Sequence, residues 1–79
     1  MRWTLHFDRE AVQNIYQIPK EIWREIKPVI LALQDEPFPD TAQPDDEDPS
    51  RLWIALPGDY VLFYEIIDER HIVKIIDIE

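Results

Sequence analysis

The clearest pattern of hydrophobic and polar positions lies in the last third of the chain, where turn residues separate three short apolar runs. The runs cover residues 51–56, 60–67 and 71–78. They are rich in β-branched and aromatic side chains, a composition typical of strands. Pro57, Gly58 and Asp59 separate the first two runs, and Gly58 can supply the positive φ that a type II turn requires. The pattern predicts a meander of three antiparallel strands.

The first third of the chain predicts a strand followed by two helices. Residues 3–7 alternate apolar and polar side chains, as a half-buried strand does. Asp8 occupies the N-cap position of a helix expected over residues 9–17. A second helix is expected over residues 19–35, because apolar side chains recur there at helical spacing. Pro28 lies inside this second run and is expected to kink it.

Residues 36–50 lose the apolar periodicity and combine four prolines with a run of acidic side chains. We expect a solvated, mobile loop, because proline and acidic residues interrupt regular structure and favour exposure to water. A calcium loop needs alternating ligands and a turn glycine, and this segment has neither, so no metal site is expected.

These elements predict one α+β domain spanning residues 1–79. Two helices should pack on one face of a four-stranded, mainly antiparallel sheet, in the order β-α-α-β-β-β. We expect the first strand to pair with residues 51–56, because two antiparallel helices would return the chain beside the strand that precedes them.

The net charge of the chain argues against two classes of binding partner. Eight basic against seventeen acidic residues give a net charge of -9. Direct binding to nucleic acid or to an anionic membrane is therefore not expected, since both need clustered Lys and Arg. The chain has no Cys and no apolar stretch that could span a membrane. We expect a soluble cytoplasmic protein that needs no cofactor.

The order and spacing of these segments resemble the RelE/ParE superfamily of toxins from toxin-antitoxin systems. The resemblance covers nearly the whole chain. Its parts are the opening Phe7-Asp8-Arg9-Glu10-Ala11, the helix start Ile18-Pro19-Lys20-Glu21-Ile22, the strand Leu52-Trp53-Ile54-Ala55-Leu56, and the entry Gly58-Asp59-Tyr60 followed by Leu62-Phe63-Tyr64-Glu65-Ile66-Ile67-Asp68.

The resemblance implies two known activities for such toxins. RelE-type members cleave ribosome-bound messenger RNA, and ParE-type members inhibit DNA gyrase. The RelE-type basic residues fall on Trp53, Ala55 and Val61 here, so none is retained. The last basic and aromatic residues of that ribonuclease site lie beyond the final strand, and this sequence ends at Glu79. We therefore expect a toxin-like domain without messenger-RNA cleavage, since the cations that stabilise a phosphorane are missing.

Strand alternation gives this departure from the family a structural meaning. One set of alternating side chains is expected to face the helices: Leu52, Ile54, Leu56, Leu62, Tyr64 and Ile66. The residues between them then form an apolar patch on the opposite face, made of Trp53, Ala55, Val61 and Phe63. Such a patch predicts a protein-protein contact, with either an antitoxin-like protein or a second copy of the chain. Strong sheet twist or the folded acidic loop could instead cover the patch within the chain.

Two further functions remain open. The first is an active ribonuclease that uses the displaced residues Arg51, His71 or Lys74, although alternation sends His71 and Lys74 to opposite faces, so that at most one of them joins Arg51. The second is a ParE-like protein that inhibits gyrase by binding it.

Overall fold

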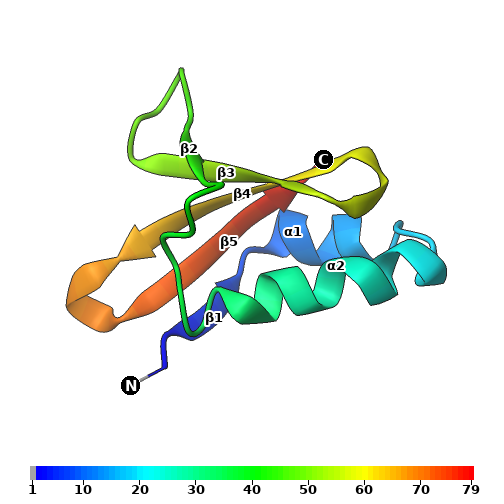
Figure 1. Ribbon diagram of the computed structural model, residues 1–79, viewed down its shortest axis with the longest axis horizontal. Coiled ribbons are helices and arrows are strands. Elements are labelled where there is room, and N and C mark those ends of the chain that lie inside the picture. The colour runs from blue at the N-terminus through cyan, green and yellow to red at the C-terminus, as the bar shows by residue number, and fades with distance from the viewer. Residues whose placement is uncertain (1) are drawn as a thin grey trace.

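The computed structural model describes residues 2–79, and Met1 lies outside the described residues. This part of the chain folds as a five-stranded mixed sheet with two α-helices packed against it (Figure 1). In chain order the elements are β1 (Thr4–Phe7), α1 (Arg9–Ile15), α2 (Lys20–Ala32), β2 (Gln43–Pro44), β3 (Arg51–Leu56), β4 (Tyr60–Ile67) and β5 (Ile72–Ile78). The predicted α+β class and the predicted meander are confirmed.

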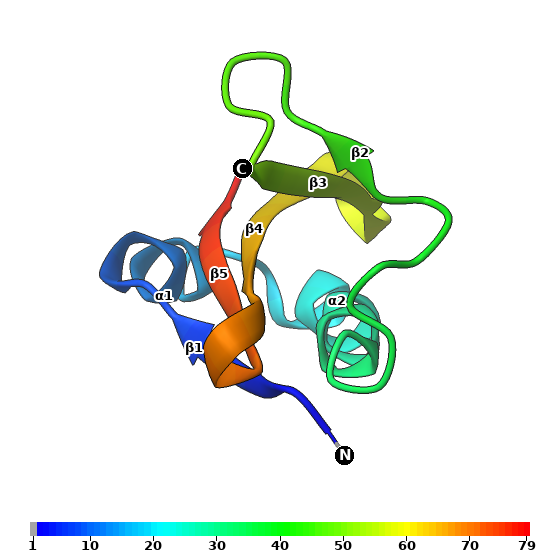
Figure 2. The same cartoon turned by 90° about the vertical axis from the view of Figure 1, so that its left-hand side faces the viewer.

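The sheet order is β1-β5-β4-β3-β2. The pairs β3-β4 and β4-β5 are antiparallel, as the turn pattern predicts, and β2 pairs antiparallel with β3. β1 lies at the opposite edge and runs parallel to β5. Seen end-on, the sheet curls from β1 through β5 and β4 to β3 and β2, and α2 lies in the concave side (Figure 2).

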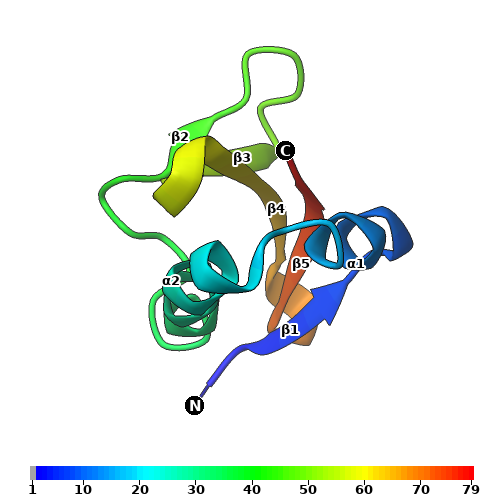
Figure 3. The same ribbon diagram turned by 90° about the vertical axis from the view of Figure 1, so that its right-hand side faces the viewer.

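The expected pairing of the first strand with residues 51–56 is wrong. The amide of Thr4 donates to the carbonyl of His71 at 3.0 Å, and the amide of Asp8 donates to Ile75 at 2.9 Å, so β1 belongs beside β5. The prediction assumed that the chain returns beside β1 after α2. The proline-rich segment carries the chain to the far edge of the sheet instead, where β2 joins β3 (Figure 3). The segment expected to be only a loop thus contains the fifth strand.

The helix ends follow local backbone rules with one exception. Asp8 is the N-cap of α1, as expected, with extended dihedrals (φ -68°, ψ 156°), but its side chain makes no capping hydrogen bond. Its carboxylate lies 3.8 Å from the ammonium group of Lys74 and 3.9 Å from the imidazole of His6. The carboxylate turns toward these two side chains on β5 and β1. α2 begins after Pro19 and remains one helix through Pro28.

A single hydrophobic core joins the helices to the sheet. The buried apolar side chains form one cluster that includes residues of α1, α2, β3, β4 and β5. The cluster consists of Ala11, Ile18, Ile26, Ile30, Leu33, Ile54, Leu56, Leu62, Tyr64, Val73, Ile75 and Ile78. Along β3 and β4 the buried positions alternate with more accessible ones, so one face of the meander supplies this core and the other face does not.

The β3–β4 turn needs glycine for two reasons. Gly58 has φ +76°, in the left-handed region that residues with a Cβ rarely adopt. A Cβ placed on Gly58 would lie 2.7 Å from Cγ2 of Ile22 on α2. The turn therefore fixes the hairpin closely against the second helix.

No helix within residues 2–79 is long and apolar enough to cross a membrane.

Candidate functional site: the outer face of β3 and β4

The four residues predicted to form an apolar patch meet on the face of the sheet that points away from the core. Trp53 pairs in register with Phe63, and Ala55 pairs with Val61. Ala55 is exposed, and the other three side chains are only partly buried. The sheet therefore brings the four residues together as alternation predicts, and we call them the outer patch.

The acidic segment borders the outer patch without burying it. Asp45 and Asp46 line a hollow of about 260 Å³ together with three patch residues, Trp53, Val61 and Phe63. The rest of the β2–β3 connection projects away from the helices, as Figure 1 shows at the top of the molecule. The hollow thus has aromatic and aliphatic walls on the sheet and carboxylates along one rim.

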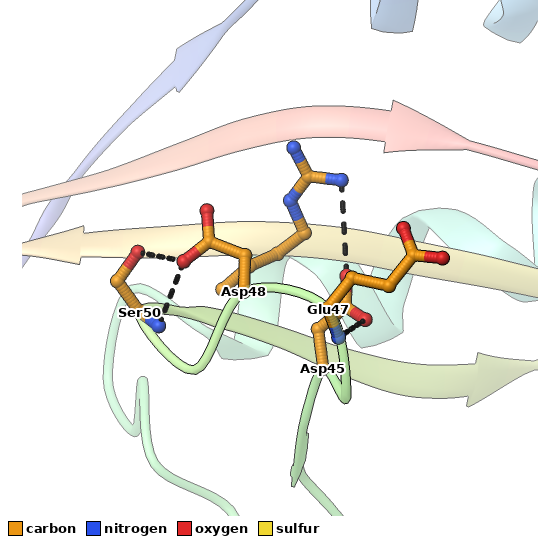
Figure 4. A network of polar contacts seen from close by, with 5 residues as sticks. Asp45, Glu47, Asp48 and Ser50 are labelled. Atoms are coloured by element: carbon orange, nitrogen blue, oxygen red, sulfur yellow. Dashed lines mark hydrogen bonds and ion pairs between the residues drawn. The ribbon is translucent and has the colours of Figure 1, made fainter.

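Residues 45–48, all acidic, form what we call the acidic rim. Short-range hydrogen bonds fix its shape. The carboxylate of Asp45 accepts from the amide of Glu47 at 3.1 Å (Figure 4). The carboxylate of Asp48 accepts from the amide of Ser50 at 3.1 Å and from its hydroxyl at 2.7 Å. These hydrogen bonds from Ser50 lower the pKa of Asp48. Hydrogen bonds within the chain therefore hold the carboxylates of Asp45 and Asp48 in place.

Arg51 lies beside the outer patch. Its guanidinium carbon lies 6.0 Å from the centre of the Phe63 ring, and its Nη1 lies 3.8 Å from Oδ2 of Asp45. Its Nε is buried and has no hydrogen-bond partner within residues 2–79. Arg51 is thus held between an aromatic ring and a carboxylate of the acidic rim.

The residues considered for a displaced ribonuclease site do not converge. His71 lies in the turn before β5 and stacks on Trp3, with ring centres 3.9 Å apart. Glu65 pairs in register with both Arg51 and Lys74 and so separates them across β4. Lys74 also approaches Asp8 at 3.8 Å. The structure therefore places a carboxylate between the two cations that share the outer face.

Within residues 2–79 no group of three His, Asp or Glu side chains is arranged to hold a metal ion. A larger hollow of about 400 Å³ lies between α2 and the segment before β2, and Leu33 and Ile54 of the core form part of its wall.

The sequence did not reveal the contribution of Asp45 and Asp46 to the hollow. Their segment lacks apolar periodicity, and the two-residue strand that places them carries a proline, which disfavours strand assignment. The amide of Asp45 donates to the carbonyl of Arg51 at 2.9 Å, which extends the β2-β3 pairing to the rim. This pairing across the sheet, together with the hydrogen bond from the amide of Glu47, positions Asp45 beside Trp53.

Sequence comparison identifies a family that matches almost the whole chain. The family model described as the ParE toxin of the type II toxin-antitoxin system parDE matches residues 5–79. A search of curated proteins found no match.

Solved structures show the same fold. The chain resembles the toxin-antitoxin complex RelBE of Escherichia coli with a TM-score of 0.84 and 22% identity, over 96% of this chain and 93% of that one. It resembles the RelBE2 complex of Mycobacterium tuberculosis with a TM-score of 0.84 and 23% identity, over 100% and 91% of the two chains. An archaeal RelE-RelB complex from Pyrococcus horikoshii OT3 gives a TM-score of 0.79 and 20% identity, over 100% and 94%.

Proposed function

The chain belongs to the ParE toxin family of type II toxin-antitoxin systems, and we propose that it acts by binding a protein through the outer patch and does not cleave messenger RNA. The observation that carries this proposal is the register pair of Trp53 and Phe63 on the face opposite the core. Aromatic side chains supply large contact areas at low entropic cost and dominate interface energetics. An aromatic pair left partly accessible beside Ala55 is suited to a protein contact.

The proposed partner is an antitoxin-like protein. The similar structures from Escherichia coli and Mycobacterium tuberculosis are toxin-antitoxin complexes, so a chain of this fold binds an antitoxin in those proteins. Self-association through the same patch is the alternative, because an apolar patch can also pair with its own copy.

The charges of the outer face support the absence of ribonuclease activity. Cleavage of a phosphodiester needs cations placed where negative charge develops. Arg51 is directed toward Asp45, and Lys74 lies 3.8 Å from Asp8. Both cations are therefore compensated by carboxylates of this chain.

A second candidate function is inhibition of DNA gyrase by direct binding. The match to a ParE model favours it, and it too would use a protein-protein contact. A gyrase supercoiling assay separates this candidate from one that binds only an antitoxin. Either target would place the protein in the cytoplasm, which we propose as its site of action.

The proposal is tested with the product of the neighbouring open reading frame. We expect the two purified proteins to associate, and Trp53→Ala to weaken association by about 2 kcal/mol or more. Tyr16→Ala is the matched control, because Tyr16 is 85% exposed at the end of α1 and lies outside the outer patch. Equal affinities for the wild-type protein and Trp53→Ala would contradict the proposal, as would a loss confined to Tyr16→Ala. Sedimentation of the chain alone tests self-association.

A further inference from the structure

We infer that the hollow beside Trp53 and Phe63 receives a cationic side chain, Arg or Lys, from the bound partner. This inference rests on the proposed function, because it specifies the chemistry of the partner at the outer patch. It predicts that a charged side chain of the partner lies at the centre of the contact and contributes to affinity in addition to the burial of apolar surface.

The composition of the hollow fits a cation. Trp53 and Phe63 contribute aromatic walls, and Asp45 and Asp46 contribute carboxylates. A guanidinium or ammonium group is attracted to the face of an aromatic ring and forms charge-assisted hydrogen bonds with a carboxylate. A cation entering this hollow can meet both kinds of partner.

The carboxylates of Asp45 and Asp46 differ in the contacts that they already make within the chain. Asp45 accepts from Glu47 and lies near Arg51, and its side chain is only 18% exposed. Asp46 is exposed, and within residues 2–79 its side chain takes part in no hydrogen bond or ion pair. Asp46 is therefore the carboxylate available to a ligand.

Arg51 shows within this chain that the surroundings accept a guanidinium. It lies over the Phe63 ring at 6.0 Å and approaches Asp45 at 3.8 Å. Asp45 lies close enough to Arg51 to offset part of the repulsion between Arg51 and an incoming cation. Residues 45–48 are all acidic, so carboxylates outnumber guanidinium groups in this segment.

The charges around the hollow disfavour acidic and apolar occupants. An acidic segment would be repelled by residues 45–48 and by the net charge of -9. An apolar side chain in the hollow would remove water from Asp46 without replacing its hydrogen bonds, which costs free energy. A basic side chain satisfies the carboxylate and covers the aromatic rings at the same time.

The test uses two small probes that differ mainly in charge. N-acetyl-arginine methylamide is titrated into the full chain, and the indole N–H signal of Trp53, assigned with Trp53→Ala, is followed by NMR. N-acetyl-citrulline methylamide is the neutral control of nearly the same shape. We expect the arginine probe to shift the Trp53 signal with at least about fivefold higher affinity than the citrulline probe, in line with a cation–π contact at a partly exposed site. Equal affinities would overturn the inference.

Two neighbouring acidic residues provide matched variants. Asp46→Asn should weaken binding of the arginine probe by up to about fivefold, because it removes one of the two carboxylates that line the hollow. Glu47→Gln removes the same charge from the next residue, which does not line the hollow, and should leave the affinity nearly unchanged. Equal effects of the two variants would overturn the inference, since they would show a general attraction to the acidic segment.

The outcomes also separate this inference from the proposed function. If Trp53→Ala weakens partner association while Asp46→Asn affects neither probe nor partner, the outer patch binds a protein but the cation anchor is wrong. If the arginine probe binds in an Asp46-dependent way but the neighbouring gene product does not bind, the hollow recognises cations and the proposed partner is wrong.

Discussion

The hydroxyl of Tyr64 donates a hydrogen bond of 3.0 Å to the carbonyl oxygen of Pro37. This bond joins the buried centre of β4 to the start of the segment that leads to β2 and the acidic rim. We expect Tyr64→Phe to destabilise the fold by about 1–3 kcal/mol, because the Pro37 carbonyl loses its buried donor. Chemical denaturation measures this change. A variant as stable as the wild-type protein would show that water replaces the bond at no cost.

The same hydroxyl predicts how stability depends on alkaline pH. Burial, with a smaller contribution from the charge of Glu36, raises the pKa of Tyr64 from 10.0 to about 12. The folded state thus favours the neutral phenol. Its contribution is fully present below pH 10 and is lost as the pH rises toward about 12. The stability difference between wild type and Tyr64→Phe should shrink over this window, and a difference that grew would contradict the assignment.

Gly58 and Ile22 predict a coupled pair of substitutions. Gly58→Ala should destabilise the fold by about 1–3 kcal/mol, because it forces a Cβ into a left-handed conformation. The new Cβ would also lie 2.7 Å from Cγ2 of Ile22. Ile22→Ala removes that methyl group, so the double variant should lose less stability than the two single losses together. Strict additivity, measured by denaturation, would show that only the dihedral matters.

Trp53 and Tyr64 should differ sharply in their cost to folding. Tyr64 is 0% exposed, and Tyr64→Ala should cost about 3–5 kcal/mol, the range for a buried aromatic side chain. Trp53 is only partly buried on the outer face, so Trp53→Ala should cost less than about 3 kcal/mol. The free energies of unfolding of the two variants decide this. A loss at Trp53 as large as at Tyr64 would mean that Trp53 serves the fold of the monomer.

The sequence was sufficient for the elements with a strong local pattern. The three runs of the meander, the positive φ of Gly58 and the shared face of Trp53 and Phe63 follow from periodicity and turn chemistry. The placement of β1 does not, because Leu5 and its neighbours alternate in the same way beside either edge of the meander. Backbone pairing with Val73 and its neighbours places β1 at the β5 edge of the sheet, and this pairing does not affect the pattern of apolar and polar residues.

The position of the acidic rim beside the outer patch could not be predicted for a related reason. Asp45 is placed by two paired residues of β2 and by hydrogen bonds within its own loop. Asp8 shows a similar limit, since its position predicted the helix cap correctly while its carboxylate turned to Lys74. In both cases the position of a charged side chain depends on contacts that the pattern of apolar positions does not encode.

The most direct test of the central claim is a message-cleavage assay on translating ribosomes. Primer extension on the messenger RNA after incubation with the purified protein should show no cleavage beyond the untreated control, because the cations of the outer face are compensated within the chain. Arg51→Ala and Lys74→Ala should then leave the pattern unchanged. Site-specific cleavage by the wild-type protein that disappears in either variant would contradict the claim and establish a ribonuclease with displaced catalytic residues.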